Sequence, residues 1–187
     1  MLGEIEMLNI SPRSEKLVDK IHSAKIVCGD SAQALKEIPD ESVQLFLTSP
    51  PYNIGKVYEQ DRKLSLDEYL EWIQPIVESM CKKVHRGGSI CWQVGNYVKS
   101  GEVYPLDLYF YEMFRKLGFK LRNRIIWRFN FGLHATTRLS GRYETILWLT
   151  KSDDYLFNLD PIRVPQIYPG KRHSKSKGKL AGTPSGN

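Results

Sequence analysis

The sequence predicts an α/β fold in which a mostly parallel sheet carries an antiparallel hairpin at one edge. Three observations support this fold class. Up to Gly118, short apolar runs alternate with helix-like amphipathic segments, the order that is typical of a parallel sheet. Two later strand-like runs are joined without a helix, as in an antiparallel pair. The length of 187 residues suits one domain with a substantial core.

The first predicted elements are two buried strands with a short helix between them. AKIVCG (24–29) is predicted to be the first strand, and Asp30-Ser31 opens the helix SAQALKEI. VQLFLT (43–48) is the second strand, with Leu47 expected in the core. Ligands of open parallel sheets lie beyond the carboxyl ends of the strands. The polar residues that follow these two strands therefore mark the expected site.

The middle of the chain predicts a long helix and then a third strand. Ser65 and Glu68 form the S-x-x-E pattern of a capping box, in which each side chain accepts from a backbone N–H of the other residue. The helix continues through YLEWIQPIVESMCKKVH and ends before Gly87. SICWQVG (89–95) is the next strand, and Trp92 is expected in the core.

The last predicted elements are a helix and two strands that pair directly. PLDLYFYEMFRKL predicts a helix that stops at Gly118. FKLRNRIIWRF (119–129) and RYETILWLTK (142–151) are strand-like, and Trp127 is expected in the core. The connection between them, FNFGLHATTRLSG, contains no helix, so the two strands should form the antiparallel edge of the sheet.

The composition limits the class of protein. No apolar run approaches the length of about eighteen residues that a membrane span needs, and the N-terminus lacks a signal-peptide core. Both features predict a cytoplasmic protein. Cys28, Cys81 and Cys91 are scattered without metal-ligand spacing, so no metal site is expected. The net charge of +6 permits a polyanionic partner without requiring one.

A stiff corner, LTSPPYN, follows the second strand. Pro50 and Pro51 cannot donate to a sheet ladder, and proline holds the residue before it extended. They therefore stop the strand and fix Ser49 and Tyr52 on either side of a rigid, carbonyl-bearing backbone. On turn chemistry alone, such a corner is a strand terminator with an aromatic plug. The segments that surround this corner in the sequence indicate a more specific role for it.

The corner and its surroundings resemble the amino-group DNA methyltransferases, which methylate N4 of cytosine or N6 of adenine with S-adenosylmethionine. The family signature, D/N/S-P-P-Y/F/W, corresponds to Ser49-Pro50-Pro51-Tyr52, and GGSICWQVGNY, NRIIWRFN and RYETILWLTK resemble later segments of the family in the same order. The resemblance covers roughly residues 24–170. It implies a Rossmann-like methyltransferase fold in which the S-P-P-Y motif precedes the cofactor motif, as in the beta-like group.

The resemblance implies that Ser49, Pro50, Pro51 and Tyr52 are catalytic. A base amine is a poor nucleophile because its lone pair is delocalised into the ring. The Ser49 hydroxyl and the Pro50 carbonyl can accept hydrogen bonds from that amine and free the lone pair for attack on the sulfonium methyl. The base must leave the duplex, and Tyr52 offers a face for it to stack on. Ser rather than Asp at the first position favours cytosine N4 over adenine N6.

The resemblance also implies a cofactor site and a DNA-binding surface. S-adenosylmethionine is expected to be bound by Asp30, Ser31, Thr48 and Asn53. A helix-capping role is the alternative for the first two of these residues. DNA is expected to contact the hairpin loop and a basic segment near the C-terminus, through His134, Thr136, Thr137, Arg138, Lys171 and Arg172. An ordinary polar connection is the alternative for the loop, and a solvated tail for the basic segment.

One feature of the family is missing from the chain. The glycine-rich F-x-G-x-G motif, which wraps the methionine part of the cofactor, does not occur in the 187 residues. We therefore expect three regions: an N-terminal extension (1–23), a partial catalytic domain (24–160) and a basic flexible segment (161–187) that leads toward a target-recognition region. Besides double-stranded DNA, the expected partner is a C-terminal half or a second subunit that carries the glycine-rich motif. Alone, the chain should be inactive or barely active.

Several functions stay open at this point. The leading prediction is a site-specific DNA methyltransferase of a bacterial or archaeal restriction–modification system, located at the nucleoid. Methyltransferases that act on RNA or protein use related proline corners, and the basic loop separates DNA from RNA poorly. The third hypothesis is a non-catalytic nucleic-acid-binding fragment, which the missing glycine-rich motif supports.

Overall fold

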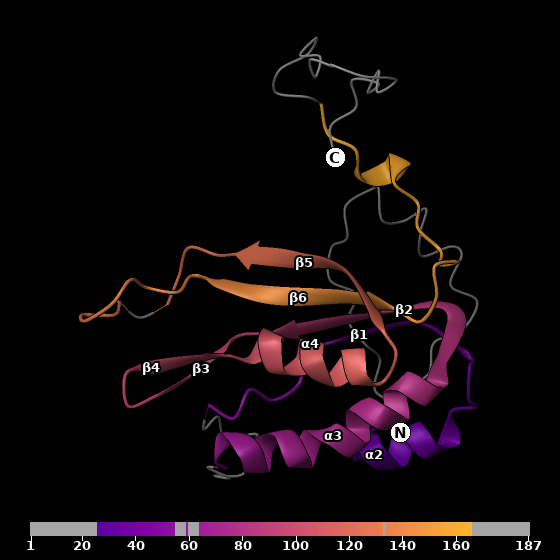
Figure 1. Ribbon diagram of the computed structural model, residues 1–187, viewed down its shortest axis with the longest axis horizontal. Helices are drawn as coiled ribbons and strands as arrows, with labels where there is room; N and C mark the ends of the chain where they lie inside the picture. Colours follow the sequence, from indigo (N-terminus) through magenta and orange to yellow (C-terminus); the bar gives the residue numbers. More distant parts are fainter. Residues whose placement is uncertain (1–25, 55–58, 60–63, 133, 166–187) are drawn as a thin grey trace, which may run out of the picture.

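The computed structural model describes residues 26–54, 59, 64–132 and 134–165, which form an α/β fold (Figure 1). The strands are β1 (Val43–Thr48), β2 (Val84–Val94), β3 (Asn96–Lys99), β4 (Glu102–Pro105), β5 (Lys120–Arg128) and β6 (Tyr143–Thr150). The helices are α2 (Ser31–Ala34), η1 (Leu35–Glu37), α3 (Leu66–Lys83), α4 (Leu106–Lys116) and η3 (Asp160–Ile162). In the described part of the chain, no helix has the length and apolar character needed to cross a membrane.

The main sheet has four strands in the order β1-β2-β6-β5. β1 and β2 run parallel, whereas β6 is antiparallel to both of its neighbours. The predicted α/β class and the antiparallel hairpin at one edge are confirmed, because β5 and β6 pair along most of their length. β3 and β4 form a separate two-stranded hairpin that projects from one end of the sheet (Figure 1).

The core lies between one face of this sheet and the helices α3 and α4, which Figure 1 shows along the same side. The strand side chains on this face alternate with outward-pointing ones, as a pleated strand requires. The fully buried ones are Ile90, Trp92, Val94, Leu147 and Leu149. Trp92 packs against two rings of α4, with its centroid 5.0 Å from that of Phe110 and 5.5 Å from that of Phe114. The predicted core position of Trp92 is confirmed.

The opposite face of the sheet is covered only in part by the described residues, since Tyr155 and Phe157 pack against Trp148 on it. Leu45 and Leu47 of β1 are 53% and 70% exposed, and Ile125 and Trp127 of β5 are exposed as well. The predicted core positions of Leu47 and Trp127 are therefore wrong. Alternation along each strand sends these side chains to the opposite face, where they stay exposed, while Phe46 points inward and packs against the core.

The strand predicted at 24–29 is also wrong for the residues that the structure describes. Residues 26–29 belong to no strand, and Ile26 is 81% exposed. A strand needs a neighbour to satisfy its backbone groups, and β1 pairs with β2 alone among the described strands. The parallel part of the described sheet is consequently the single β1–β2 pair, a smaller share than the sequence predicts.

The helix caps follow the sequence closely. Asp30 is the N-cap of α2, where its carboxylate accepts a hydrogen bond from Gln33 N at 3.1 Å. The predicted capping box begins α3: Ser65 Oγ accepts from Glu68 N at 3.3 Å, and Glu68 Oε2 accepts from Ser65 N at 2.8 Å. These bonds satisfy N–H groups that the first turn of a helix leaves free.

Two local features were not anticipated by the sequence pattern. The β3–β4 hairpin turns at Ser100 and Gly101, whose φ angles of 51° and 84° match the turn that joins tightly twisted strands. Gly88 lies in β2 where β1 approaches closely. A Cβ at this position would lie 2.9 Å from the carbonyl oxygens of both Val43 and Gln44, so no larger residue fits without moving the strands.

Candidate active site

A backbone corner follows β1 at its carboxyl end, as the Pro-Pro pair predicts. Ser49 is exposed, Pro50 is buried and Tyr52 is half-buried. The ring of Tyr52 lies against the backbone at the end of β2, because a Cβ at Gly95 would be 3.4 Å from two ring carbons. The corner therefore presents a hydroxyl to solvent from a base that is packed against the sheet.

Three polar side chains continue from the Ser49 hydroxyl into the sheet. Ser49 Oγ lies 2.6 Å from the Tyr52 hydroxyl. The Tyr52 hydroxyl donates to Glu144 Oε2 at 3.3 Å, and Gln93 Nε2 donates to the same carboxylate oxygen at 2.5 Å. Gln93 of β2 pairs with Ile146, two residues along β6 from Glu144, so Gln93 and Glu144 share one face of the sheet. The sheet thus supplies the far end of a hydrogen-bonded chain that begins in the corner.

The corner backbone is held from the other side by helix α3. Tyr69 is buried, and its hydroxyl donates to the carbonyl oxygen of Pro51 at 2.6 Å. Burial raises the pKa of Tyr69 well above the usual value for tyrosine, so the hydroxyl keeps the proton it donates. Pro51 is thereby fixed to the helix as well as to the strand.

Asn53 closes the loop that follows the corner. Its φ of 58° is in the left-handed region, which asparagine tolerates better than most residues. Its side-chain Nδ2 donates to Leu64 O at 2.8 Å, and Leu64 N donates to its Oδ1 at 3.3 Å. Both ends of the amide are therefore engaged with the backbone of Leu64, where the chain returns to enter α3.

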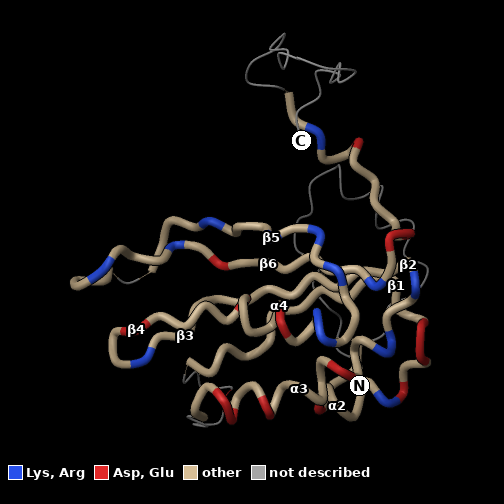
Figure 2. The backbone as a smooth tube through the Cα atoms, viewed as in Figure 1, with Lys and Arg blue, Asp and Glu red and all other residues tan. Residues whose placement is uncertain are grey.

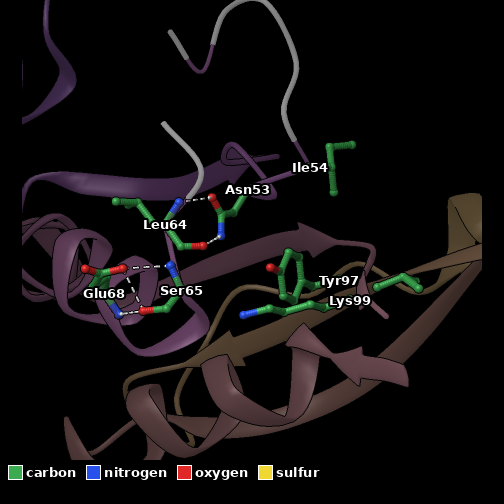
Figure 3. Close-up of a pocket in the computed structure, with 8 residues that line it drawn as sticks. Asn53, Ile54, Leu64, Ser65, Glu68, Tyr97 and Lys99 are labelled. Atoms are coloured by element: carbon green, nitrogen blue, oxygen red, sulfur yellow. Dashed lines mark hydrogen bonds between the residues drawn. The ribbon is translucent and has the colours of Figure 1, made fainter. Parts of the chain in front are cut away.

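A pocket of about 660 Å³ opens beside this loop (Figure 3). Its walls come from the corner loop, the N-terminal capping box of α3 and the β3–β4 hairpin. The lining residues are Asn53, Ile54, Leu64, Ser65, Glu68, Tyr97, Val98 and Lys99. Figure 3 shows the Lys99 and Tyr97 side chains on one wall, facing the capping box across the pocket.

Of the four residues expected to bind a cofactor, one lines this pocket. Asn53 lines the 660 Å³ pocket, whereas Asp30, Ser31 and Thr48 do not. Asp30 is exposed and caps α2, the alternative that the sequence left open, and Ser31 is the first residue after that cap. Thr48 is half-buried at the last position of β1, opposite Trp92.

The hairpin loop between β5 and β6 brings the predicted DNA-contacting residues to the surface. His134, Thr136, Thr137 and Arg138 are all exposed. Arg142 Nη2 lies 3.2 Å from the ring nitrogens of His134. Figure 2 shows Lys and Arg recurring along β5 and the loop. Lys171 and Arg172 lie outside the described residues.

A second pocket, of about 610 Å³, lies between this loop and the end of β2. His134 and Arg138 line it from the loop, Gly95 lines it from the end of β2, and Glu144 lines it from β6. Gly95 lies beside the Tyr52 ring, and Glu144 accepts from the Tyr52 hydroxyl. The pocket therefore reaches from the loop to two residues that neighbour Tyr52, although no residue of the corner itself lines it.

Three residues of the site were missed by sequence reasoning. Tyr69 is the first aromatic residue after the capping box and resembles an ordinary core residue in sequence. Gln93 and Glu144 are polar residues within otherwise apolar strands, in ICWQV and YETIL, and this interruption is the signal that could have singled them out. Nothing in the sequence reveals that Glu144 accepts from Tyr52 or that Gln93 donates to Glu144.

Known proteins that resemble this chain are DNA methyltransferases. A family model described as DNA methylase matches residues 43–184. The Type II methyltransferase M.BglII of Bacillus subtilis is 51% identical over 170 residues, which is 89% of this chain and 47% of the relative. The chain spans about half the length of the curated relatives that it matches.

Solved structures agree with this comparison. A DNA modification methylase of Thermus thermophilus, complexed with S-adenosyl-L-methionine, gives a TM-score of 0.55 at 26% identity, over 70% of this chain and 54% of that one. PvuII DNA methyltransferase, described as cytosine-N4-specific, gives a TM-score of 0.62 at 23% identity over 81% of this chain and 58% of that one. The second likeness is one of fold.

Proposed function

This chain belongs to the DNA methylase family, and from that premise we propose that it carries the catalytic corner of a Type II DNA methyltransferase. The reaction transfers a methyl group from S-adenosylmethionine to an exocyclic amino group of a flipped base. N4 of cytosine is favoured over N6 of adenine, because Ser49 stands at the first position of the motif. The observation that carries the proposal is the exposed Ser49 hydroxyl, held 2.6 Å from Tyr52 at the end of β1.

The proposed chemistry uses hydrogen-bond acceptors that are in place before the substrate arrives. The Ser49 hydroxyl and the Pro50 carbonyl accept from the base amine, which draws its lone pair out of conjugation. S-adenosylmethionine supplies the electrophilic methyl group when it is bound. Tyr69 holds the Pro51 carbonyl from α3 at 2.6 Å, so the corner needs little rearrangement on binding. Such preorganisation is commonly the largest part of enzymatic rate enhancement.

Tyr52 keeps its proposed role at the base, with a narrower geometry than the sequence suggests. One side of its ring is occupied by the backbone at Gly95, and its hydroxyl is bonded to Glu144. The ring is half-buried, which leaves part of its surface for an extruded base. The 610 Å³ pocket is lined by His134 and Arg138 and by Glu144, the partner of Tyr52, and it offers room for that base and for the flanking backbone.

The described residues fit part of an S-adenosylmethionine site. The amide of Asn53 is engaged with Leu64, so Asn53 contributes by shaping the loop rather than by direct bonds through that amide. Asp30 is exposed, and its carboxylate remains able to accept from a polar group of the adenosine. Ser31 and Thr48 complete the proposed set. The fit is incomplete, in keeping with the absence of F-x-G-x-G from the sequence.

We infer that a polypeptide carrying the glycine-rich motif completes the cofactor site, either as a C-terminal half or as a second subunit. The uncovered face of β1 supports this inference, because Leu45 and Leu47 are largely exposed there. Apolar side chains that face water lose the stabilisation of burial, and β1 is an edge strand of the described sheet, open to a further strand. The relatives, about twice as long as this chain, contain the additional sequence that such a half requires.

Methyl transfer to DNA tests the proposal. The chain is incubated with labelled S-adenosylmethionine and duplex DNA, alone and together with the part of the Bacillus subtilis relative that it does not cover. We expect N4-methylcytosine after digestion to nucleosides, mainly in the mixture. Finding only N6-methyladenine would contradict the base preference, and preferential methylation of structured RNA would contradict the DNA substrate. No transfer, and no calorimetric heat with S-adenosylmethionine in either sample, would defeat the enzyme assignment.

Ser49→Ala tests the role of the hydroxyl in the same assay. It should slow methyl transfer by at least about 10-fold and leave DNA affinity nearly unchanged, because the lost acceptor acts mainly in the transition state. Ser42→Ala is the matched control, since Ser42 Oγ donates only to Pro39 O in a surface turn. Equal losses of binding and turnover for Ser49→Ala would contradict the assigned role.

A further inference from the structure

Glu144 occupies an unusual place for a carboxylate, on an inner strand of the sheet and next to the corner. It stands on β6, it is half-buried, and it is 92 residues away from Tyr52 in sequence. Its Oε2 accepts from Tyr52 and from Gln93. The next residue of the strand, Thr145, is buried on the opposite face. Glu144 therefore meets the corner with one specific oxygen.

The donor and acceptor roles along this chain follow from the chemistry of its groups. An ionised carboxylate can only accept, so the Tyr52 hydroxyl must give its single hydrogen to Glu144. Tyr52 then has no hydrogen left for Ser49. The 2.6 Å contact between the two hydroxyls consequently requires Ser49 to donate and Tyr52 to accept. With its only hydrogen directed at Tyr52, the Ser49 oxygen presents lone pairs alone to the outside.

We propose that Glu144 is a positioning residue that makes Ser49 an obligate hydrogen-bond acceptor. A free serine hydroxyl can donate or accept, and a hydrogen directed toward a base amine would repel its N–H groups. Fixing the hydrogen on Tyr52 removes that arrangement before any substrate arrives. Gln93 supports the same polarity, that is, the same order of donors and acceptors along the chain of hydrogen bonds, because it donates to the oxygen that receives the Tyr52 hydrogen. This inference rests on the proposed function of Ser49 at a base amine.

The proposal also explains how serine can stand where the family signature allows aspartate. A carboxylate at position 49 would accept without help, because it has no hydrogen to direct. Toward the substrate, serine at this position is restricted to accepting by the Glu144 carboxylate, which lies two hydrogen bonds away. The two solutions place the negative charge differently: at the substrate for aspartate, and inside the sheet, behind Tyr52, for serine.

Resonance Raman spectroscopy of the tyrosine C–O stretch tests the polarity in the protein without substrate or cofactor. Donating a hydrogen bond raises this frequency, and accepting one lowers it. The difference spectrum between the wild type and Ser49→Ala isolates Tyr52 among the ten tyrosines. We expect its band to move up, because Ser49→Ala removes an accepted bond. A downward shift would mean that Tyr52 donates to Ser49, and it would overturn the proposal.

A second spectroscopic comparison places the cause at Glu144. In a Glu144→Met background, the Tyr52 hydroxyl no longer donates to residue 144 and can donate to Ser49, so adding Ser49→Ala should now move the band down. In a Glu144→Gln background the amide oxygen can still accept, and the upward shift should persist. Glu102→Met is the matched control, because Glu102 accepts from Tyr104 at 2.7 Å in the β3–β4 hairpin, apart from the corner. An unchanged sign in Glu144→Met would contradict the role of Glu144.

Kinetics then connect the polarity to methyl transfer. Glu144→Met should slow single-turnover transfer by about 10-fold or more, less than the roughly 10²–10³-fold typical of a directly contacting group, with the KM for DNA unchanged. Glu144→Gln should keep most of the rate. In a Tyr52→Phe background, Glu144→Met should add nothing, because the connecting hydroxyl is gone. Additive losses would contradict the proposal, whereas absence of transfer by the wild type, with the Raman signs as expected, would count against the proposed function alone.

Discussion

Removing the Tyr69 hydroxyl is the sharpest test of how the corner is held. Tyr69→Phe keeps the buried ring, which packs edge-on against Phe110 at 6.2 Å between centroids, so no cavity is created. It removes one hydrogen bond of 2.6 Å and leaves the Pro51 carbonyl without that donor. An intramolecular hydrogen bond contributes about 0.5–1.5 kcal/mol, and a stranded buried acceptor costs about 1–3 kcal/mol.

The expected cost lies between these limits, because Pro51 is half-buried and water can replace the lost donor in part. We expect Tyr69→Phe to lower the free energy of unfolding by about 1.5 kcal/mol, which corresponds to roughly 3–6 °C in Tm. Urea titration followed by far-UV circular dichroism measures the change, with an unchanged m-value. Tyr109→Phe on α4, where the tyrosine is more than a third exposed, is the control.

A loss under about 0.3 kcal/mol, or one equal to that of the control, would refute the reasoning, because the Pro51 carbonyl would then not depend on Tyr69. The same variant separates stability from function. If Tyr69 holds the corner, methyl transfer should fall further than the lost fraction of folded protein explains. If it only stabilises the fold, transfer per folded molecule should be unchanged.

Three other perturbations have definite expected outcomes. Burial raises the pKa of the Cys81 thiol from 9.0 to about 12, so the contribution of the thiol to stability is full below pH 9 and is lost as the pH rises toward 12. Cys81→Ala should flatten that loss when Tm is measured against pH, and parallel Tm curves for the variant and the wild type would contradict the prediction. Arg138→Ala should reduce the slope of the logarithm of the DNA-binding constant against the logarithm of the salt concentration by about 1. Lys36→Ala on η1 should leave this slope unchanged. Equal slopes for the two variants would exclude the loop from the DNA interface. Arg124→Ala leaves the Asp107 carboxylate, whose side chain is 4% exposed, without its ion-pair partner. It should lower the free energy of unfolding, measured by urea titration, by about 2–3 kcal/mol. Asp107→Asn leaves no buried charge and should cost less; the reverse order would contradict this prediction.

The elements that were predicted correctly are those whose start or end depends on residues close together in the sequence. The bounds of β1 follow from an apolar run that ends at prolines, and the start of α3 follows from the Ser65–Glu68 capping box. The β5–β6 hairpin follows from two strand-like runs without a helix between them. In each case the determining residues are neighbours in sequence, so a pattern within a short window is sufficient.

The failures share a different cause. Whether Leu47 is buried depends on what covers that face of the sheet, and whether 24–29 forms a strand depends on a neighbouring strand. Neither condition can be read from the segment itself. The meeting of Tyr52 and Glu144 depends on the register of three strands, which single-residue patterns do not encode. The β3–β4 turn is the exception, since Ser100-Gly101 is a local hairpin signal, although this hairpin was not among the predicted elements.

The close approach of β1 to β2 at Gly88 has a consequence for how this protein can vary. A methyl group at that position would collide with two main-chain oxygens, and main chain, unlike a side chain, has no alternative rotamer to adopt. In a saturation-mutagenesis library, position 88 should therefore tolerate almost nothing, while the neighbouring surface positions His85 and Arg86 accept many residues. Selection would keep this glycine for reasons of space alone, and a survey that ranks positions by invariance would place it beside the reacting groups although it touches none of them.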